Sequence, residues 1–446
     1  MAADGIVVIG AGPAAAAAAI GLARMGEPVT LVGEPRRFAA VEGVSARVLG
    51  ALHGLGLEQA MGAFAPPSPR RVRWNGMPSE ANRESLVDRQ LFDRGVLDDL
   101  ERLGVKVVRG HVAEVASAPG CHEIRVETPG GMQTLAADFI VEARGRAAPG
   151  GGLPRVRGAE TVSLLQYWQG PSGSAHSAVQ SCEDGWAWMA ALADGRRYLQ
   201  LTLDVRSAAL PPKKALAGYC TARLRDIDAA LPFLRGAEPV GEPHARTSTP
   251  VLNEVLAGDD WIRVGDAAMA VDPLSGNGIF QALSSALQAP AVVATLRHDP
   301  ARAALARRFH QQRIEHLFYR FARIGRDFYA QETAWADRPF WQLRRGWPDA
   351  EPLHRSVIPA EVTVARRPVL HRDRIVEADV VLTPDQPQGI WHLDGVPLAS
   401  ALLAVRAALP GQPVREALAA ALNLPIERAA GLIEWMHRQG WIADLG

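Results

Sequence analysis

The sequence predicts an α/β fold, with a parallel, doubly wound sheet, an inserted β-rich segment and a small α+β unit at the end. The N-terminal stretch GIVVIGAGPAAAAAAIGLARMGEPVTLVGE predicts a strand, a glycine-rich turn, an alanine-rich helix and a second strand, which form a βαβ unit. From about residue 155 to 250 the pattern changes to short alternating strands such as YLQLTLD. The stretch WIRVGDAAMAVDPLSGNGIFQALSSAL then returns to a strand, a glycine-rich loop and a helix.

These changes of pattern divide the chain into four segments. We expect residues 1–155 and 251–347 to be two parts of one α/β domain, the second part ending in long helices. In the first part, VDRQLFDRGVLDDLERLG predicts a helix, and VKVVRG and ADFIVEARG predict two more strands. Residues 156–250 form the β-rich insertion, to which some earlier elements contribute. Three prolines in WPDAEPLHRSVIP mark the boundary of a separate unit at 348–446.

Composition excludes several classes of function. The 446 residues are 48% apolar, which is enough for a sizeable core, and 48 acidic residues balance 48 basic ones. Balanced charge gives no global field that would attract nucleic acid or a membrane surface. Three cysteines fit a reducing compartment, and the apolar N-terminus lacks the basic start of a signal peptide. We expect a soluble cytoplasmic protein with no metal site, no nucleic-acid partner and no membrane partner.

The first glycine-rich turn matches a dinucleotide fingerprint. Gly10 permits the tight turn, Gly12 lets the backbone approach a pyrophosphate, and Ala15 is small enough for helix–sheet packing. The pyrophosphate then rests on the helix N-terminus, where free N–H groups favour negative charge. Glu34, at the end of the second strand, can accept hydrogen bonds from the ribose hydroxyls. The expected contacts of the turn are Gly10, Gly12, Pro13, Ala14 and Ala15.

A second motif favours FAD over NAD. RVGDAAMAVDPLSGNG, residues 263–278, resembles the motif of the para-hydroxybenzoate-hydroxylase-like flavoproteins. The resemblance implies a glutathione-reductase-like FAD domain with an inserted substrate domain, over roughly residues 5 to 345. It also implies that Asp266, after Gly265, binds the ribityl chain, and that a helix N-terminus stabilises charge at the flavin pyrimidine edge. The implied contacts of that helix start are Pro273, Gly276, Asn277, Gly278 and Ile279.

Two shorter stretches agree with this family. VDRQLFDRGVL resembles its Arg-x-x-x-Asp helix start, which implies a cofactor contact for Arg89 on the phosphate or ribityl side. Val112, in the following strand, would then lie near the adenine. VEGVSARVL resembles the segment beside the isoalloxazine, which makes Val44, Ser45 and Arg47 candidate contacts. For each of these residues a packing or surface role is the alternative.

The stretch CEDGWAWMAA contains the start of a halogenase signature. Flavin-dependent halogenases carry Trp-x-Trp-x-Ile-Pro, but here Trp186 and Trp188 are followed by Met189, Ala190 and Ala191. Halogenases also use an early lysine, whereas the first lysine of this chain is Lys106. Both departures argue against halogenation. On a strand the two indoles face the same side, as packed core residues or as a wall of the substrate cavity.

No catalytic base stands out, so the catalytic residues stay unknown. His176, His244 and Glu183 fall in the expected substrate domain, and we keep Trp186, Trp188 and His244 as candidates for the substrate cavity. Electrophilic hydroxylation of an indole needs little help from a base, because the ring is already nucleophilic.

The electron donor is left open by the sequence. Single-component hydroxylases carry an Asp-Gly motif for NAD(P)H use, and EARGRAAPG has Arg144 before Gly145 instead. NAD(P)H and a separate reductase both remain as donors.

The C-terminal segment predicts short strands followed by helices. VPLASALLAVRAAL, PVREALAAALN and PIERAAGLIEWMHRQGWIA each carry an apolar helical stripe, in a winged-helix-like arrangement. GIWHLDG followed by helices resembles PqqD-like modules, in which a peptide adds as a strand to a sheet edge. The mixed charge of the last helix argues against DNA binding. A covering domain or a dimer contact is the alternative.

The combination of these features resembles FAD-dependent monooxygenases of the halogenase-like branch, in particular the flavoproteins that mature tryptophylquinone cofactors, such as that of quinohemoprotein amine dehydrogenase. The resemblance implies O2-dependent hydroxylation, through a flavin C4a-hydroperoxide, of the indole ring of a tryptophan in a partner polypeptide, which the C-terminal unit would bind. The alternatives are a hydroxylase or halogenase of a free or carrier-bound small aromatic, a flavin-dependent C=C reductase, and a non-enzymatic FAD-binding protein.

Overall fold

The computed structural model describes residues 5–408 and 413–443. The chain forms two compact units, of which the larger comprises Met1–Val293 and Leu317–Ala350. The smaller comprises Ala294–His316 and Glu351–Gly446. The end of the helix predicted at 396–409 lies outside the described residues.

A parallel sheet is the base of the larger unit. Within the described residues it has five strands, in the order β18-β10-β1-β2-β6, and each neighbouring pair is parallel. The order places the N-terminal strand in the centre, as the βαβ prediction requires. All residues of β1 and β10 are buried, because both faces of the sheet are covered. The strands are β1 (Ile6–Ile9), β2 (Val29–Gly33), β6 (Lys106–Arg109), β10 (Phe139–Glu142) and β18 (Trp261–Arg263).

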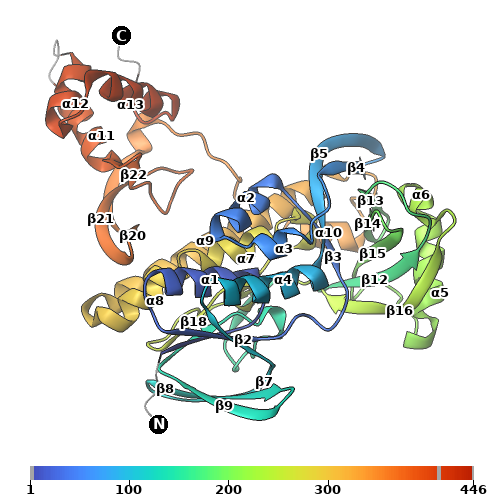
Figure 1. Ribbon diagram of the computed structural model, residues 1–446. Helices are drawn as coiled ribbons and strands as arrows, with labels where there is room; N and C mark the ends of the chain where they lie inside the picture. The colour runs from blue at the N-terminus through green and yellow to red at the C-terminus, as the bar shows by residue number, and fades with distance from the viewer. Residues whose placement is uncertain (1–4, 409–412, 444–446) are drawn as a thin grey trace. The chain divides into compact units, whose positions relative to one another are not determined.

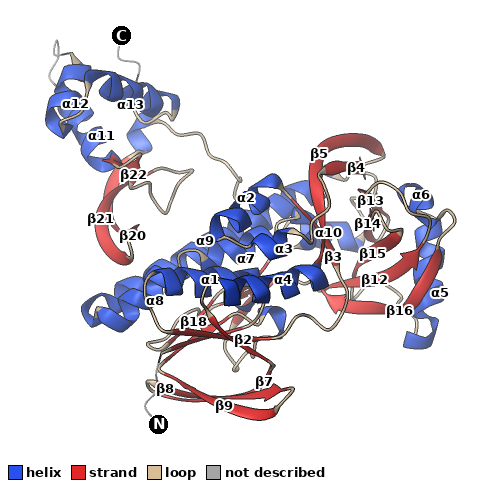
Figure 2. Cartoon of the chain, viewed as in Figure 1, coloured by secondary structure: helices blue, strands red, loops and turns tan. Residues whose placement is uncertain are grey.

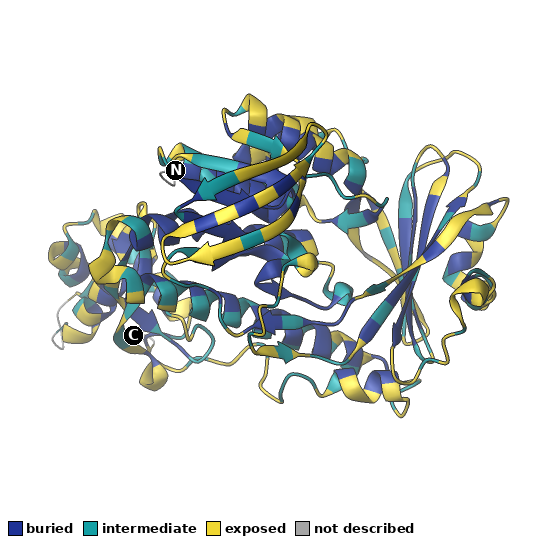
Figure 3. Ribbon diagram, turned by 90° about the horizontal axis from the view of Figure 1, so that it is seen from below, coloured by how far each residue is buried: buried dark blue, intermediate teal, exposed yellow. Residues whose placement is uncertain are grey.

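Helices cover one face of this sheet and a second sheet covers the other (Figure 1). The helices α1 (Pro13–Arg24) and α4 (Arg89–Arg102) lie on the first face. On the second face, β7 (His111–Ala118), β8 (Cys121–Thr128) and β9 (Gly131–Ala137) form an antiparallel sheet whose apolar residues pack on the parallel strands. Buried and exposed residues alternate along the central strand β8, as expected for a sheet with one wet face (Figure 3).

A second large sheet forms the inserted part of this unit. It has eight strands in the described chain, in the order β16-β12-β15-β14-β13-β4-β5-β3. Every neighbouring pair is antiparallel except β13 and β4. Its first three strands along the chain precede residue 156, so earlier elements do contribute to it. The strands are β3 (Val41–Val44), β4 (Ser68–Trp74), β5 (Met77–Asp88), β12 (Thr161–Gln169), β13 (His176–Cys182), β14 (Gly185–Ala191), β15 (Arg196–Asp204) and β16 (Glu238–Thr247).

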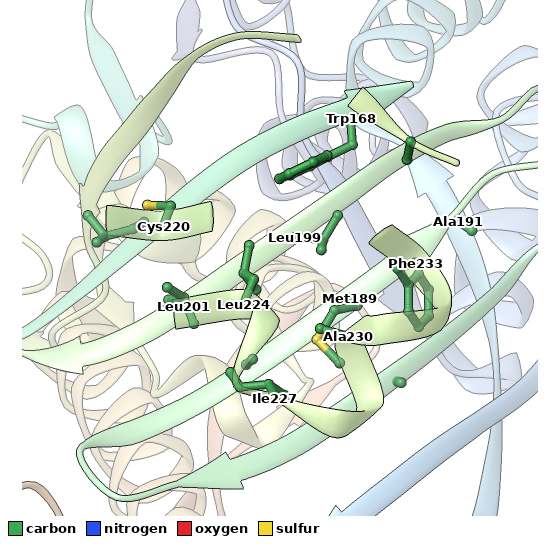
Figure 4. Close-up of a cluster of buried hydrophobic side chains, with 14 of the residues drawn as sticks. Trp168, Met189, Ala191, Leu199, Leu201, Cys220, Leu224, Ile227, Ala230 and Phe233 are labelled. Carbon is green, nitrogen blue, oxygen red and sulfur yellow. The ribbon is translucent and has the colours of Figure 1, made fainter. Parts of the chain in front are cut away.

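The two faces of this sheet have different partners. On one face, Met189, Leu199 and Leu201 pack against α5 (Leu216–Arg225) and neighbouring residues up to Phe233, in a closed apolar core (Figure 4). Side chains alternate between faces along each strand, so the residues between these positions point to the opposite side. That opposite face contains Trp186 and Trp188 and opens on the cavity described below.

The remaining elements of the larger unit are mostly helical, as the helix colouring in Figure 2 shows. They are α2 (Ala46–Leu55), α3 (Glu58–Met61), α6 (Leu231–Leu234), α7 (Gly278–Ala286), α10 (Pro339–Arg345) and a small sheet of β11 (Arg155–Arg157), β17 (Val251–Asn253) and β19 (Met269–Ala270). Two further helices, α8 (Ala289–His298) and α9 (Ala303–Gln331), run from one unit into the other along the chain.

One stretch among the described residues, Gly278–His298, is long and apolar enough to cross a membrane. However, 78% of its most apolar window is buried in the fold, which is typical of a core helix.

The smaller unit has its own apolar core. Two hairpins precede three helices, and Val381, Leu402 and Trp441 are among the buried residues that join them. The three helices lie where the apolar stripes predicted them. The elements are β20 (Thr363–His371), β21 (Arg374–Leu382), β22 (His392–Leu393), β23 (Val396–Pro397), α11 (Leu398–Ala407), α12 (Val414–Leu422) and α13 (Ile426–Arg438).

A buried ion pair ties the helical end of the larger unit to the eight-stranded sheet. Arg344 of α10 lies 3.2 Å from an oxygen of Asp204 at the end of β15, and both side chains are buried. Arg344 also donates to the Thr161 hydroxyl, and Asp204 accepts from the backbone N–H groups of Arg206 and Ser207. Both terminal nitrogens of Arg344 and both oxygens of Asp204 therefore have partners, whereas the Arg344 Nε has none.

Replacing Asp204 by Ala should lower the free energy of unfolding by about 3–5 kcal/mol, because it leaves the Arg344 guanidinium buried without its counter-charge. Chemical denaturation followed by circular dichroism measures this. The matched control is Asp194→Ala, which removes an exposed pair with Arg196 and should cost no more than about 1 kcal/mol. Equal losses in the two variants would contradict this account of the pair.

Candidate active site

The turn between β1 and α1 has the geometry of a phosphate cradle. Gly10 has φ +134°, and a Cβ there would lie 2.4 Å from the carbonyl oxygen of Ala143. The packing of the protein therefore requires this glycine. Gly12 is different, because its φ is −92° and a Cβ there would meet nothing within 4 Å. Its lack of a side chain leaves open space at the start of α1, which fits the close approach of a pyrophosphate.

The N-terminus of α1 provides backbone hydrogen-bond donors for a phosphate group. Gly12 is the N-cap residue and supplies no side-chain cap to this helix. The first N–H groups of a helix have no partner inside it, and the helix dipole adds partial positive charge. Ala14 and Ala15 are buried, and Gly265, with φ +60°, comes so close that its Cβ would lie 2.7 Å from that of Ala14. Because Ala14 and Gly265 are small, the two glycine-rich motifs can pack directly against each other.

Glu34 lies directly after β2, as predicted. One carboxylate oxygen accepts a hydrogen bond from Arg37 at 3.0 Å and lies 3.2 Å from His111 Nδ1. Its side chain is one-third exposed, so it can still accept bonds from hydroxyl groups. Gly33 precedes it, and a Cβ there would lie 2.8 Å from the backbone of Gly10. Sequence analysis did not include Gly33, although it completes the close packing of the turn.

Asp266 lies just beyond the carboxyl end of β18, where ligands bind in open parallel sheets. Burial raises the pKa of this carboxyl, and the nearby Arg146, with Nε 3.6 Å away, opposes that shift. Arg146 is itself fixed by hydrogen bonds to the carbonyls of Thr249 and Val271. The carboxylate and its cation therefore hold a defined place at the end of β18.

The loop before α7 presents a second helix N-terminus. Gly276 adopts a left-handed conformation with φ +61°, and the side-chain amide of Asn277 donates to the Ser275 carbonyl. Asn277 is the N-cap residue and gives α7 no side-chain cap, so the N–H groups of Gly278 and Ile279 have no partner from that residue. This arrangement fits the stabilisation of negative charge on a ring placed beside the loop.

A cavity of about 320 Å³ joins this loop to the eight-stranded sheet. Its volume is within the usual range of small-molecule sites. The loop side consists of Pro273, Leu274, Gly276, Gly278, Ile279 and Phe280, and the side formed by β3 and α2 includes Val44 and Val48. The sheet side consists of Ser163, Leu165, Val179, Trp186, Trp188, Tyr198, Gln200 and Arg246.

Trp186 and Trp188 both line this cavity, and each is also packed. Trp186 is 3% exposed and donates through Nε1 to the hydroxyl of Tyr329 at 3.2 Å. The Tyr329 hydroxyl in turn donates to Asp272 at 2.9 Å, and Asp272 accepts from the backbone N–H of Leu274 in the loop. Burial raises the pKa of Tyr329 and that of Asp272, which keeps the tyrosine as a neutral donor. This chain of hydrogen bonds therefore links the sheet side of the cavity to the loop before α7.

The other candidate cofactor contacts lie nearby in different environments. Arg89 is buried and pairs with Glu42 and, at 3.1 Å, with Asp93. The arginine and the aspartate of the helix-start motif therefore bind each other across one helical turn. Ser45 and Arg47 are exposed at the start of α2, and Val112 is buried against the parallel sheet.

The structure does not bring the three polar candidates of the insertion into the cavity. His244 is exposed on the edge strand β16, where it pairs with Leu165, and it is not a lining residue. The His176 Nδ1 lies 2.9 Å from the Ser174 carbonyl, and Glu183 pairs with Arg338 at 2.8 Å. The lining residues also include no lysine. The cavity therefore lacks the group with which halogenases deliver the halogen.

Sequence analysis missed several lining residues and their supports. The alternation in YLQLTLD could have identified Gln200, because the leucines of that strand occupy the opposite face. Asp272 lies within the second motif and could have been included with it. Tyr329 has no signal in the sequence, because only the fold brings α9 beside the tryptophan.

Comparison with known proteins agrees with this geometry. The model of the FAD-dependent oxidoreductase family matches residues 5–220. A solved structure of QhpG, described as a peptidyl tryptophan dihydroxylase essential for tryptophylquinone cofactor biogenesis, is 54% identical. The match covers 99% of this chain and 100% of that one, with a TM-score of 0.87. The chain belongs to the FAD-dependent oxidoreductase family. It is therefore an enzyme with FAD as its cofactor, as expected from the two glycine-rich motifs.

More distant relatives of this FAD-dependent oxidoreductase have different activities. The tryptophan 2-halogenase of Chondromyces crocatus is 28% identical, over 76% of this chain and 70% of the halogenase. The menaquinone reductase of Mycolicibacterium smegmatis is 29% identical, over 63% of this chain and 74% of the reductase. The solved structure of the flavin-dependent halogenase CmlS is 19% identical, with a TM-score of 0.74 over 99% of this chain and 96% of its own, and shares the fold.

The two glycines of the first turn should respond differently to the same change. Gly12→Ala should weaken FAD binding at least about tenfold while the apoprotein melts at an unchanged temperature, because the added Cβ meets no protein atom within 4 Å and would take up space that the pyrophosphate needs. Gly10→Ala should destabilise the apoprotein itself by about 1–3 kcal/mol, because its backbone is left-handed and its Cβ meets the carbonyl of Ala143. FAD titration and thermal melting of both apoproteins measure these effects. A lower apoprotein melting temperature in Gly12→Ala would contradict the cofactor role.

Proposed function

We propose that this enzyme is an FAD- and O2-dependent monooxygenase that hydroxylates the indole ring of a tryptophan within a partner polypeptide, during the biogenesis of a tryptophylquinone cofactor. The observation that carries the proposal is the aromatic cavity that joins the α7 loop to Trp186 and Trp188, in a chain that matches a peptidyl tryptophan dihydroxylase over its whole length. Because that relative is a dihydroxylase, we propose two hydroxylations.

The cofactor is held by the backbone and by two carboxylates. Gly10, Gly12 and the α1 N-terminus bind the pyrophosphate, Glu34 binds the ribose, and Asp266 binds the ribityl chain. The N-terminus of α7 would stabilise negative charge on the flavin. When bound and reduced, FAD would supply the O2 chemistry that places oxygen on an electron-rich aromatic ring.

The chain's own residues would position the substrate. Trp188 and Tyr198 stand edge to face, with ring centroids 5.7 Å apart, and give an aromatic corner against which a further ring can pack. The carboxylates that line the cavity, Glu42 and Glu84, are paired with arginines. We therefore assign no general base, in agreement with the intrinsic nucleophilicity of indole. The electron donor is NAD(P)H or a separate reductase. At the position where single-component hydroxylases carry their NAD(P)H motif, this chain has Arg144, which is bonded to Glu142.

The partner polypeptide is proposed to bind to the smaller unit. The hairpin of β20 and β21 consists of two nine-residue strands, and within the described chain β20 pairs only with β21. One side of β20 is thus an edge to which an extended peptide can add. The three cysteines are free thiols, which supports the cytoplasm as the place of this encounter.

The proposal is tested by mass spectrometry of the products. Reduced, FAD-loaded enzyme is mixed with O2 and chloride, and is offered either free tryptophan or a tryptophan-containing polypeptide encoded beside it. We expect two oxygen atoms to be added to one tryptophan of the polypeptide, with no chlorine and no change in the free amino acid. Oxidation or halogenation of free tryptophan alone would overturn the proposal in favour of a small-molecule enzyme.

Hydrogen–deuterium exchange tests the role of the smaller unit. Adding the same polypeptide to the FAD-loaded enzyme should slow exchange in residues 363–382, because a bound strand pairs with backbone N–H groups at the β20 edge. The matched control is the hairpin of β7 and β8, which should exchange at an unchanged rate. Protection confined to other parts of the chain would contradict a docking role for this hairpin.

A further inference from the structure

Gln200 has an unusual position on the cavity face of the eight-stranded sheet. It lies in the middle of β15 and pairs with Leu165 on one side and with Trp188 on the other. Tyr198 and Thr202, two residues away in each direction, share its face. Gln200 is thus a single amide surrounded by two aromatic rings, a leucine and a buried threonine, and it lines the cavity.

The amide of Gln200 is oriented by its neighbours. Its Nε2 donates to the Thr202 hydroxyl at 3.0 Å, and that hydroxyl lies 3.3 Å from the hydroxyl of Ser163. Ser163 in turn contacts the hydroxyl of Ser248. This chain of hydroxyls uses one N–H of the Gln200 amide, and the carbonyl oxygen takes no part in it. In the described structure the Gln200 carbonyl oxygen accepts no hydrogen bond.

A hydrogen-bond acceptor without a partner, placed beside aromatic rings, favours an aromatic ligand that carries a donor. An indole has one polar group, an N–H that donates but cannot accept. A carbonyl oxygen beside two aromatic rings matches that group. On the same side, Arg246 is a donor that stacks over Phe38, the Ser163 hydroxyl already contacts those of Thr202 and Ser248, and Tyr198 carries a further hydroxyl. Burial of an N–H without an acceptor is costly, so an acceptor placed beside these rings favours a ligand that carries an N–H.

We propose that Gln200 accepts a hydrogen bond from the N–H of the target indole and thereby fixes which edge of the ring faces the flavin. Gln200 is a specificity-determining residue in this account, and Thr202 positions it. The inference rests on the proposed function, because it assumes that the cavity receives an indole.

The test compares two ligands that differ at one atom. N-acetyl-L-tryptophanamide and its benzothienyl analogue, in which sulfur replaces the N–H, are titrated into the oxidised, FAD-loaded enzyme, and binding is followed by the change in flavin absorbance. The wild type should favour the indole at least about tenfold. Gln200→Met, which keeps the size but removes the acceptor, should bind the two ligands within about twofold of each other. Gln133→Leu, an equivalent loss on an exposed strand, should keep the wild-type ratio.

Three results would overturn the role of Gln200. They are equal binding of both ligands by the wild type, an unchanged preference in Gln200→Met, and a loss of preference in Gln133→Leu as well. If the Gln200 variant fails to fold, the proposal is still tested by the wild-type enzyme, because equal affinities for the indole and the benzothienyl ligand would overturn it. Hydroxylation of the polypeptide by the wild type is measured separately. Its absence overturns the proposed function, whereas its presence with an unchanged ligand preference overturns only the assignment of Gln200.

Discussion

The alternation of side chains in the eight-stranded sheet is the constraint on which the site depends. The leucines of β15 commit one face to a closed core with α5. The other face is left with Tyr198, Gln200 and Thr202, and the neighbouring strand adds the two tryptophans in register. Because the core fixes the register, a shift of one residue would move every cavity residue into the core. The register of the strands therefore determines both the stability of the insertion and the shape of the cavity.

The sheet and the cofactor domain are connected by polar groups as well as by packing. Trp186, Tyr329 and Asp272 form a chain of hydrogen bonds from the cavity wall to the loop before α7. The buried pair of Arg344 and Asp204 ties α10 to the end of β15. These buried bonds hold the wall at a fixed place relative to the loop. This fixed relation is what an enzyme needs when it delivers oxygen to chosen positions of one ring.

The sequence predicted the parallel sheet, the inserted strands and the three C-terminal helices, because each depends on local periodicity and turn residues. It also predicted the glycine-rich turns, since a tight turn or a close approach restricts the residue type strongly. It could not predict the polar groups that support the cavity. Tyr329 reaches Trp186 from 143 residues away, and Gln200 is distinguished only by its partners on adjacent strands. Conversely, His244 is a suggestive residue type that the register places on an exposed edge.

The central claim is that one cavity brings the target indole against the flavin, between the α7 loop and the tryptophan wall. A crystal structure of the FAD-loaded enzyme with a bound tryptophan-containing peptide tests it most directly. We predict an indole packed beside Trp188, its N–H on Gln200, and the flavin ring at the N-terminus of α7. An indole bound elsewhere, or a flavin ring that does not border this cavity, would contradict the account.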